Sequence, residues 1–74
     1  MRITTNETAW KVWGLGPAGR RIAMAHPELE ACVQWCKLNG VTRWQSKGLP
    51  PEYVGYNEAD QPVVVITRPE PNDV

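Results

Sequence analysis

Residues 27–40, Pro27-Glu-Leu-Glu-Ala-Cys-Val-Gln-Trp-Cys-Lys-Leu-Asn-Gly40, predict a single amphipathic helix. Apolar side chains recur there at helical spacing and form one stripe, made of Leu29, Cys32, Val33 and Cys36. Pro27 suits the first helical position, and His26 before it would be the capping residue. The positive end of the helix dipole favours the two glutamates in the first turn. Asn39-Gly40 suits the end of the helix, because glycine readily adopts a left-handed conformation. We therefore expect the helix to run from Pro27 to Asn39.

Residues 9–25, on the N-terminal side of this helix, predict a β-hairpin. Trp10-Lys-Val-Trp13 is aromatic and β-branched, and residues 20–25 alternate loosely, so both segments favour strands. Gly14-Leu-Gly-Pro-Ala-Gly19 between them matches the dinucleotide-binding pattern G-x-G-x-x-G. Pro27 leaves little room for the helix that such a site needs, so we interpret the glycines as a hairpin turn. Arg20 and Arg21 beside the turn offer an alternative, the binding of a phosphate or carboxylate.

The chain after the helix predicts two more strands. Residues 41–51 hold Gly48 and Pro50-Pro51 and are expected to form a long connection. Tyr53–Tyr56 predicts a short strand, and the β-branched run in residues 62–67 predicts a buried central strand. The order strand-strand-helix-strand-strand predicts an α+β fold, a small antiparallel sheet with one helix packed on one face. We expect residues 1–67 to form a single compact domain and residues 68–74 a disordered C-terminal tail.

Length and charge exclude several classes of protein. With 74 residues the chain is too short for a multi-domain enzyme or a complete nucleotide-binding fold, while 42% hydrophobic residues suffice for a small core. The net charge is zero, but residues 9–48 carry six basic against two acidic side chains, and residues 49–74 carry one against five. The two halves, at +4 and −4, either pack together and neutralise each other or form a bipolar surface that orients a charged partner.

Catalytic and metal-binding residues are sparse. Cys32 and Cys36 lie one helical turn apart, at a spacing that does not suit a disulfide, so we expect two reduced core thiols. Their spacing from His26 matches no common zinc site, and the predicted helix separates His26 from Cys36 by roughly 15 Å. We expect no enzyme activity, no metal and no cofactor.

The aromatic content suggests a binding surface. Four tryptophans are too many for so small a core. Side chains alternate along a strand, so Trp10 and Trp13 should point to opposite faces of the sheet. Exposed Trp, Tyr and Arg side chains anchor protein interfaces. We therefore predict a non-catalytic module that binds a larger protein as an inhibitor or adaptor. Domains of this size include ones carried by phages and other mobile elements. The predicted partner-binding residues are Trp13, Arg20, Arg21, Arg43, Trp44 and Tyr56.

The same mixture of cations and aromatics permits an alternative, a small nucleic-acid-binding protein that stacks bases and contacts phosphates. Zero net charge and the acidic C-terminal half argue against this alternative. The N-terminus has no apolar stretch typical of a secretion signal, and no run is long enough to span a membrane, so we expect a cytoplasmic protein. Open strand edges leave homodimerisation as a further expectation.

Overall fold

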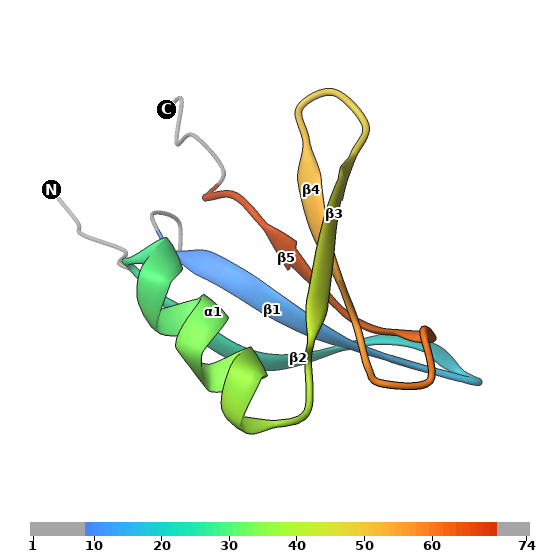
Figure 1. Ribbon diagram of the computed structural model, residues 1–74. Helices are drawn as coiled ribbons and strands as arrows, with labels where there is room; N and C mark the ends of the chain where they lie inside the picture. The colour runs from blue at the N-terminus through green and yellow to red at the C-terminus, as the bar shows by residue number, and fades with distance from the viewer. Residues whose placement is uncertain (1–8, 70–74) are drawn as a thin grey trace, which may run out of the picture.

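The computed structural model describes residues 9–69 and shows five antiparallel strands and one helix. The predicted α+β fold is confirmed, with one strand more than expected. The order in the sheet is β2-β1-β5-β4-β3, so β2 and β3 form its edges and α1 connects one edge to the other (Figure 1). The elements are β1 (Trp10–Gly16), β2 (Gly19–His26), α1 (Leu29–Leu38), β3 (Arg43–Lys47), β4 (Glu52–Tyr56) and β5 (Pro62–Thr67).

The glycine-rich segment is the predicted hairpin turn. Strands β1 and β2 pair from Trp10 opposite His26 to Gly16 opposite Gly19, which leaves only Pro17 and Ala18 in the loop. Gly19 has a φ of 110°, a backbone conformation that residues other than glycine rarely adopt. No helix begins after these glycines, since β2 follows them directly. The dinucleotide pattern is therefore a feature of a tight turn.

The helix begins two residues later than predicted. His26 belongs to β2, and its Nδ1 atom accepts a hydrogen bond from the Glu28 backbone N–H at 3.0 Å. Glu28 has extended backbone and precedes the first helical residue, Leu29, so neither Pro27 nor His26 has its predicted role. The side chain of His26 therefore bridges the junction between the strand and the helix by a hydrogen bond that sequence spacing did not reveal.

The C-terminal end of α1 agrees with the prediction. Gly40 has a φ of 102°, and its N–H donates to the Lys37 carbonyl at 3.3 Å. The Val41 N–H donates to the Cys36 carbonyl at 3.1 Å, which completes the hydrogen-bond pattern of a Schellman motif. Val41 and Cys36 are also buried in the same cluster, so the end of the helix is fixed by both polar and apolar contacts.

Strand β3 was expected to be part of a connection. Its sequence, Arg43-Trp-Gln-Ser-Lys47, is polar, and only Trp44 among its side chains is partly buried. It is an edge strand held by its pairing with β4, and edge strands commonly carry charged side chains that discourage aggregation. The glycine and prolines that suggested a long loop occupy only the short β3–β4 turn.

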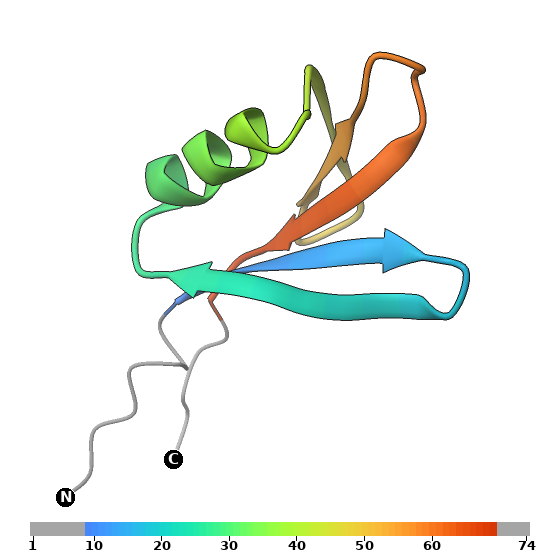
Figure 2. The ribbon, with the colours of Figure 1, turned by 90° about the horizontal axis from the view of Figure 1, so that it is seen from below.

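The main core lies between α1 and one face of the sheet (Figure 2). Its buried members are Val12, Cys32, Cys36, Val41, Val64 and Ile66. A smaller cluster of Val54, Tyr56 and Val65, with Leu15 against it, lies on the opposite face. Strand β5 thus contributes buried side chains to both faces, as predicted for a central strand.

The described part of the chain contains no helix long and apolar enough to cross a bilayer. Arg68 and Pro69, at the start of the predicted tail, have no regular secondary structure. Residues 70–74 of that tail and residues 1–8 of the predicted domain lie outside the described residues.

Candidate binding surface opposite the helix

The sheet has one face covered by α1 and one face that the helix leaves free, which we call the helix-free face. Strand alternation and pairing assign side chains to it, because residues opposite each other in a ladder point to the same side. Val12 and Ile66 face the helix, so their neighbours Trp13 and Val65 face away from it. The polar and aromatic members of the helix-free face are Lys11, Trp13, Arg20, Arg43, Gln45, Lys47, Glu52, Tyr56 and Thr67.

Trp13 is the central aromatic residue of this face. Its indole Nε1–H donates to the Thr67 hydroxyl at 3.0 Å, which fixes the ring orientation over β1 and β5. Trp13 is half-buried, and Ile22, which lies opposite it on β2, is 54% exposed. Trp10 lies on the other face beside Tyr53, with ring centroids 6.3 Å apart. The predicted opposite orientation of the two tryptophans is therefore confirmed.

Arg20 reaches across the helix-free face to Glu52. The guanidinium Nη2 lies 3.2 Å from the carboxylate Oε1, although β1 and β5 separate the two parent strands. Both side chains stay exposed, at 46% and 41%, so solvent screens the ion pair and it stabilises the fold little. The contact nevertheless joins the first hairpin to the second on this face.

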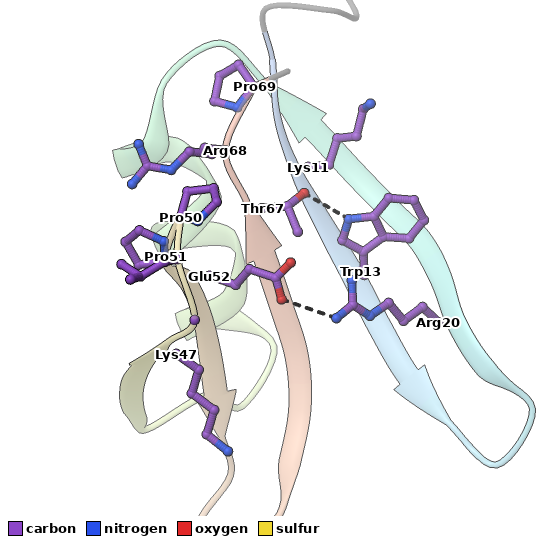
Figure 3. A pocket seen from close by; sticks show the side chains of 12 residues that line it. Lys11, Trp13, Arg20, Lys47, Pro50, Pro51, Glu52, Thr67, Arg68 and Pro69 are labelled. Carbon is purple, nitrogen blue, oxygen red and sulfur yellow. Dashed lines mark hydrogen bonds and ion pairs between the residues drawn. The ribbon is translucent and has the colours of Figure 1, made fainter. Parts of the chain in front are cut away.

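A groove of about 640 Å³ lies along this ion pair (Figure 3). One wall comes from β1 and β2, with Lys11, Trp13 and Arg20. The other comes from the β3–β4 turn and the start of β4, and the chain after β5 closes one end. The residues of these other parts are Lys47, Gly48, Leu49, Pro50, Pro51, Glu52, Thr67, Arg68 and Pro69. Among residues 9–69, Lys11, Arg20 and Lys47 line the groove against one carboxylate, Glu52, which makes it positive. Arg68 also lines it, but its guanidinium lies 5.7 Å from the centroid of the Trp10 ring on the other face.

Arg43 and Tyr56 form a separate cluster on the same face. The Arg43 guanidinium lies 4.2 Å from the centroid of the Tyr56 ring, and its Nη2 is 2.6 Å from Asp60 Oδ1. Tyr56 is only 8% exposed, and its hydroxyl donates to Gln45 Oε1 at 3.0 Å. The Tyr56 ring therefore packs between the sheet and the Arg43 guanidinium, and Arg43 is the member of the pair that faces solvent.

The other two predicted residues lie elsewhere. Arg21 pairs with Gly14, so its side chain leaves the sheet on the side of α1, near the hairpin tip. Trp44 was expected to be exposed in a loop, and this expectation is wrong: it lies in β3, half-buried against the main core. A β-carbon at Gly55 would lie 3.1 Å from its ring, which shows how closely the indole covers that glycine. The structure brings together Trp13 and Arg20, with Arg43 and Tyr56 on the same face.

Sequence reasoning did not assign Lys11, Glu52, Thr67 or Arg68 to the site. Alternation along β1 was a usable signal for Lys11, because it shares a face with Trp13. Glu52 contacts Arg20, which is 32 positions away in the sequence, and this contact depends on the order of the strands. No local pattern reveals such a contact.

Cys32 and Cys36 are free, buried thiols, as predicted. Burial raises the pKa of Cys36 to about 11, with the neighbouring Cys32 adding to the effect. Burial also raises the pKa of Cys32, and a backbone hydrogen bond at His26 partly offsets this. Both thiols therefore resist forming the thiolate that nucleophilic chemistry needs. Among residues 9–69, no three His, Cys, Asp or Glu side chains are close enough to hold a metal ion.

The raised pKa of Cys36 predicts a loss of stability in alkali. The unfolded thiol ionises near its ordinary value of 9, whereas the folded one holds its proton up to about 11. The folded state therefore binds more protons in this range, and the free energy of unfolding should fall as the pH rises through it. Urea unfolding of wild type and Cys36→Ala across this range measures the effect. A pH dependence that is the same in both proteins would contradict it.

In the comparisons with known proteins, the chain matches no protein-family model, no curated protein and no solved structure. The inference of function therefore rests on the geometry of the helix-free face.

Proposed function

We propose that the protein is a non-catalytic module that binds a larger protein through its helix-free face, as an inhibitor or adaptor. The observation that carries this proposal is the position of Trp13. Its indole is oriented by Thr67 and is half-buried beside the groove, with exposed Ile22 opposite it on β2 and Arg20 on the same wall. Tryptophan and arginine at such positions dominate the energetics of protein interfaces.

The chemistry of the described residues favours binding over catalysis. The two thiols are buried and have raised pKa values. The single histidine uses Nδ1 to accept a backbone hydrogen bond where β2 turns into α1. The charged residues Lys11, Arg20, Lys47 and Glu52 of the groove lie on strands around an open surface, which suits the docking of another chain. The free thiols also support a cytoplasmic location.

The edge strands β2 and β3 offer a second way to dock a protein. Each has one side that no strand within residues 9–69 covers, so a partner strand can extend the sheet by backbone hydrogen bonds. A second copy of the chain can use the same edges to form a homodimer.

The positive groove supports one alternative, a small nucleic-acid-binding protein. Lys11, Arg20 and Lys47 line the groove together with Trp13, and this combination of cations and an aromatic suits single-stranded nucleic acid. Its distinguishing property is salt dependence, because displaced counterions make nucleic-acid affinity fall steeply with salt. An affinity that changes little with salt would contradict this alternative.

We expect Trp13→Ala to weaken partner binding by about 2 kcal/mol or more, roughly thirtyfold in Kd, because an interface anchor is lost. The measurement is capture from a lysate of the cells that make the protein, with nuclease present, followed by titration of the purified partner. Leu38→Ala is the matched control, because Leu38 is an exposed apolar residue on α1. Capture that depends on Leu38 but not on Trp13 would contradict the proposal.

A further inference from the structure

The groove concentrates positive charge that the rest of the chain balances. Lys11, Arg20 and Lys47 line it, and within residues 9–69 Glu52 is its one acidic residue. Figure 3 shows Lys11 and Lys47 on either side of the Arg20–Glu52 ion pair. No carboxylate within residues 9–69 forms a salt bridge with Lys11, Lys47 or Arg68. The electrostatic complement of this groove is a negatively charged ligand.

The Arg20–Glu52 pair behaves as an exchangeable contact. Both groups are exposed and screened by solvent, so separating them removes little stability. A carboxylate that enters the groove, which Trp13 and the proline-rich turn line, can accept hydrogen bonds from the same guanidinium. Glu52 therefore competes with an acidic ligand for Arg20.

The uncharged walls of the groove are largely apolar. Pro50, Pro51 and Pro69 have no backbone N–H to donate, and the Trp13 indole N–H is already bonded to Thr67. Polar recognition therefore falls to the flexible cations, while the Trp13 ring and the prolines accept apolar groups. This combination fits a chain in which acidic and apolar side chains alternate.

Two features favour a peptide over a nucleic acid. Within residues 9–69, Trp13 is the only aromatic residue that lines the groove, whereas single strands are held by several aromatic platforms in succession. The nearest candidate for a second platform, Tyr56, is buried beneath Arg43. The volume of about 640 Å³ is that of a site for a small ligand or a short peptide segment.

We propose that this groove binds an extended acidic segment of a partner protein. Carboxylates of the segment contact Lys11, Lys47 and Arg20, where they replace Glu52, and an apolar side chain packs on the Trp13 ring. The proposal rests on the proposed function and identifies the chemistry of the partner.

The test is a selection from a random library of displayed 12-residue peptides on the intact protein, followed by titration of the enriched sequences as free peptides. We expect the enriched sequences to be rich in Asp and Glu. Lys47→Glu should weaken their binding about tenfold, since one attraction becomes a repulsion. Lys37→Glu is the matched control, because it makes the same change of charge on α1. It should leave the affinity within about twofold.

A second pair of variants tests for a gain in peptide affinity, which misfolding cannot produce. Glu52→Gln removes the competing carboxylate and should raise the affinity about threefold or more at low salt. Asp60→Asn is its control, because Asp60 also pairs with an exposed arginine but lies outside the groove. Asparagine tolerates the φ of 65° found there. Asp60→Asn should leave the affinity unchanged.

The outcomes separate this proposal from the proposed function. Neutral or basic enriched peptides that still require Trp13 would overturn the acidic ligand but support the helix-free face as the binding surface. Binding unaffected by Trp13→Ala would contradict both. A library without enrichment would overturn the peptide ligand. Tight binding of a 12-nucleotide oligo-dT, without any acidic peptide, would favour the nucleic-acid alternative.

Discussion

Ile66→Ala should destabilise the protein by about 2–5 kcal/mol, the largest effect we expect of any single substitution. Ile66 is 0% exposed and lies in the central strand β5, opposite Val12 on one side and Tyr53 on the other. Its truncation leaves a cavity between the sheet and α1. A 74-residue domain has a total stability of about 4–11 kcal/mol, so this loss removes a large part of it.

Urea unfolding compares this variant with Ile22→Ala, in which the same side chain is removed from an exposed edge-strand position. Ile22→Ala should cost about 1 kcal/mol or less, because little buried surface is lost. If Ile66→Ala prevents folding, Ile66→Val gives a graded measurement, with an expected cost of about 0.5–1.5 kcal/mol. Equal costs for the two alanine variants would show that Ile66 is not in the core.

Gly55→Ala should also destabilise the fold, by about 1–3 kcal/mol, through overpacking. A β-carbon at this position would lie 2.7 Å from Val64 Cγ2 and 2.8 Å from Val41 Cγ1. It would also lie 3.1 Å from Trp44 Cζ3, so three side chains of the core and its margin would have to shift together. Gly55 is therefore needed for the close approach of these side chains.

Gly16→Ala is the matched control for Gly55→Ala. A β-carbon there meets nothing within 4 Å. The substitution should be neutral, or stabilising by up to about 1 kcal/mol, because alanine restricts the unfolded chain. Thermal unfolding of both variants tests the packing around Trp44 directly. A Gly55→Ala variant as stable as Gly16→Ala would contradict the position of Trp44 against the core.

The parts of the fold that could be predicted were those determined by residues close together in the sequence. The hairpin followed from glycines at the turn, and the C-terminal end of α1 followed from Gly40, because both need backbone conformations that other residues avoid. Strand β3 could not be found in this way, since its polar sequence forms a strand only through pairing with β4. The burial of Trp44 against the core could not be predicted either, because it depends on the pairing of β3 with β4.

The candidate site could be predicted by residue type and only partly by position. Trp13 and Arg20 were predicted as binding residues because exposed aromatic and guanidinium groups suit interfaces, and both line the same groove. The opposite wall comes from the β3–β4 turn and the start of β4, which the order of the strands places across β5 from β1. Contacts such as Arg20 to Glu52 depend on this long-range arrangement and leave no local pattern.

The most direct test of the helix-free face as the binding surface is an NMR titration of the tryptophan indole N–H signals. The chain has four tryptophans, and single Trp→Phe variants assign each signal. On addition of the captured partner or an enriched peptide, we predict the largest shift at Trp13 and smaller ones at the half-buried Trp10 and Trp44. The largest shift at Trp35, which lies on α1, with an unchanged Trp13 signal, would contradict the account.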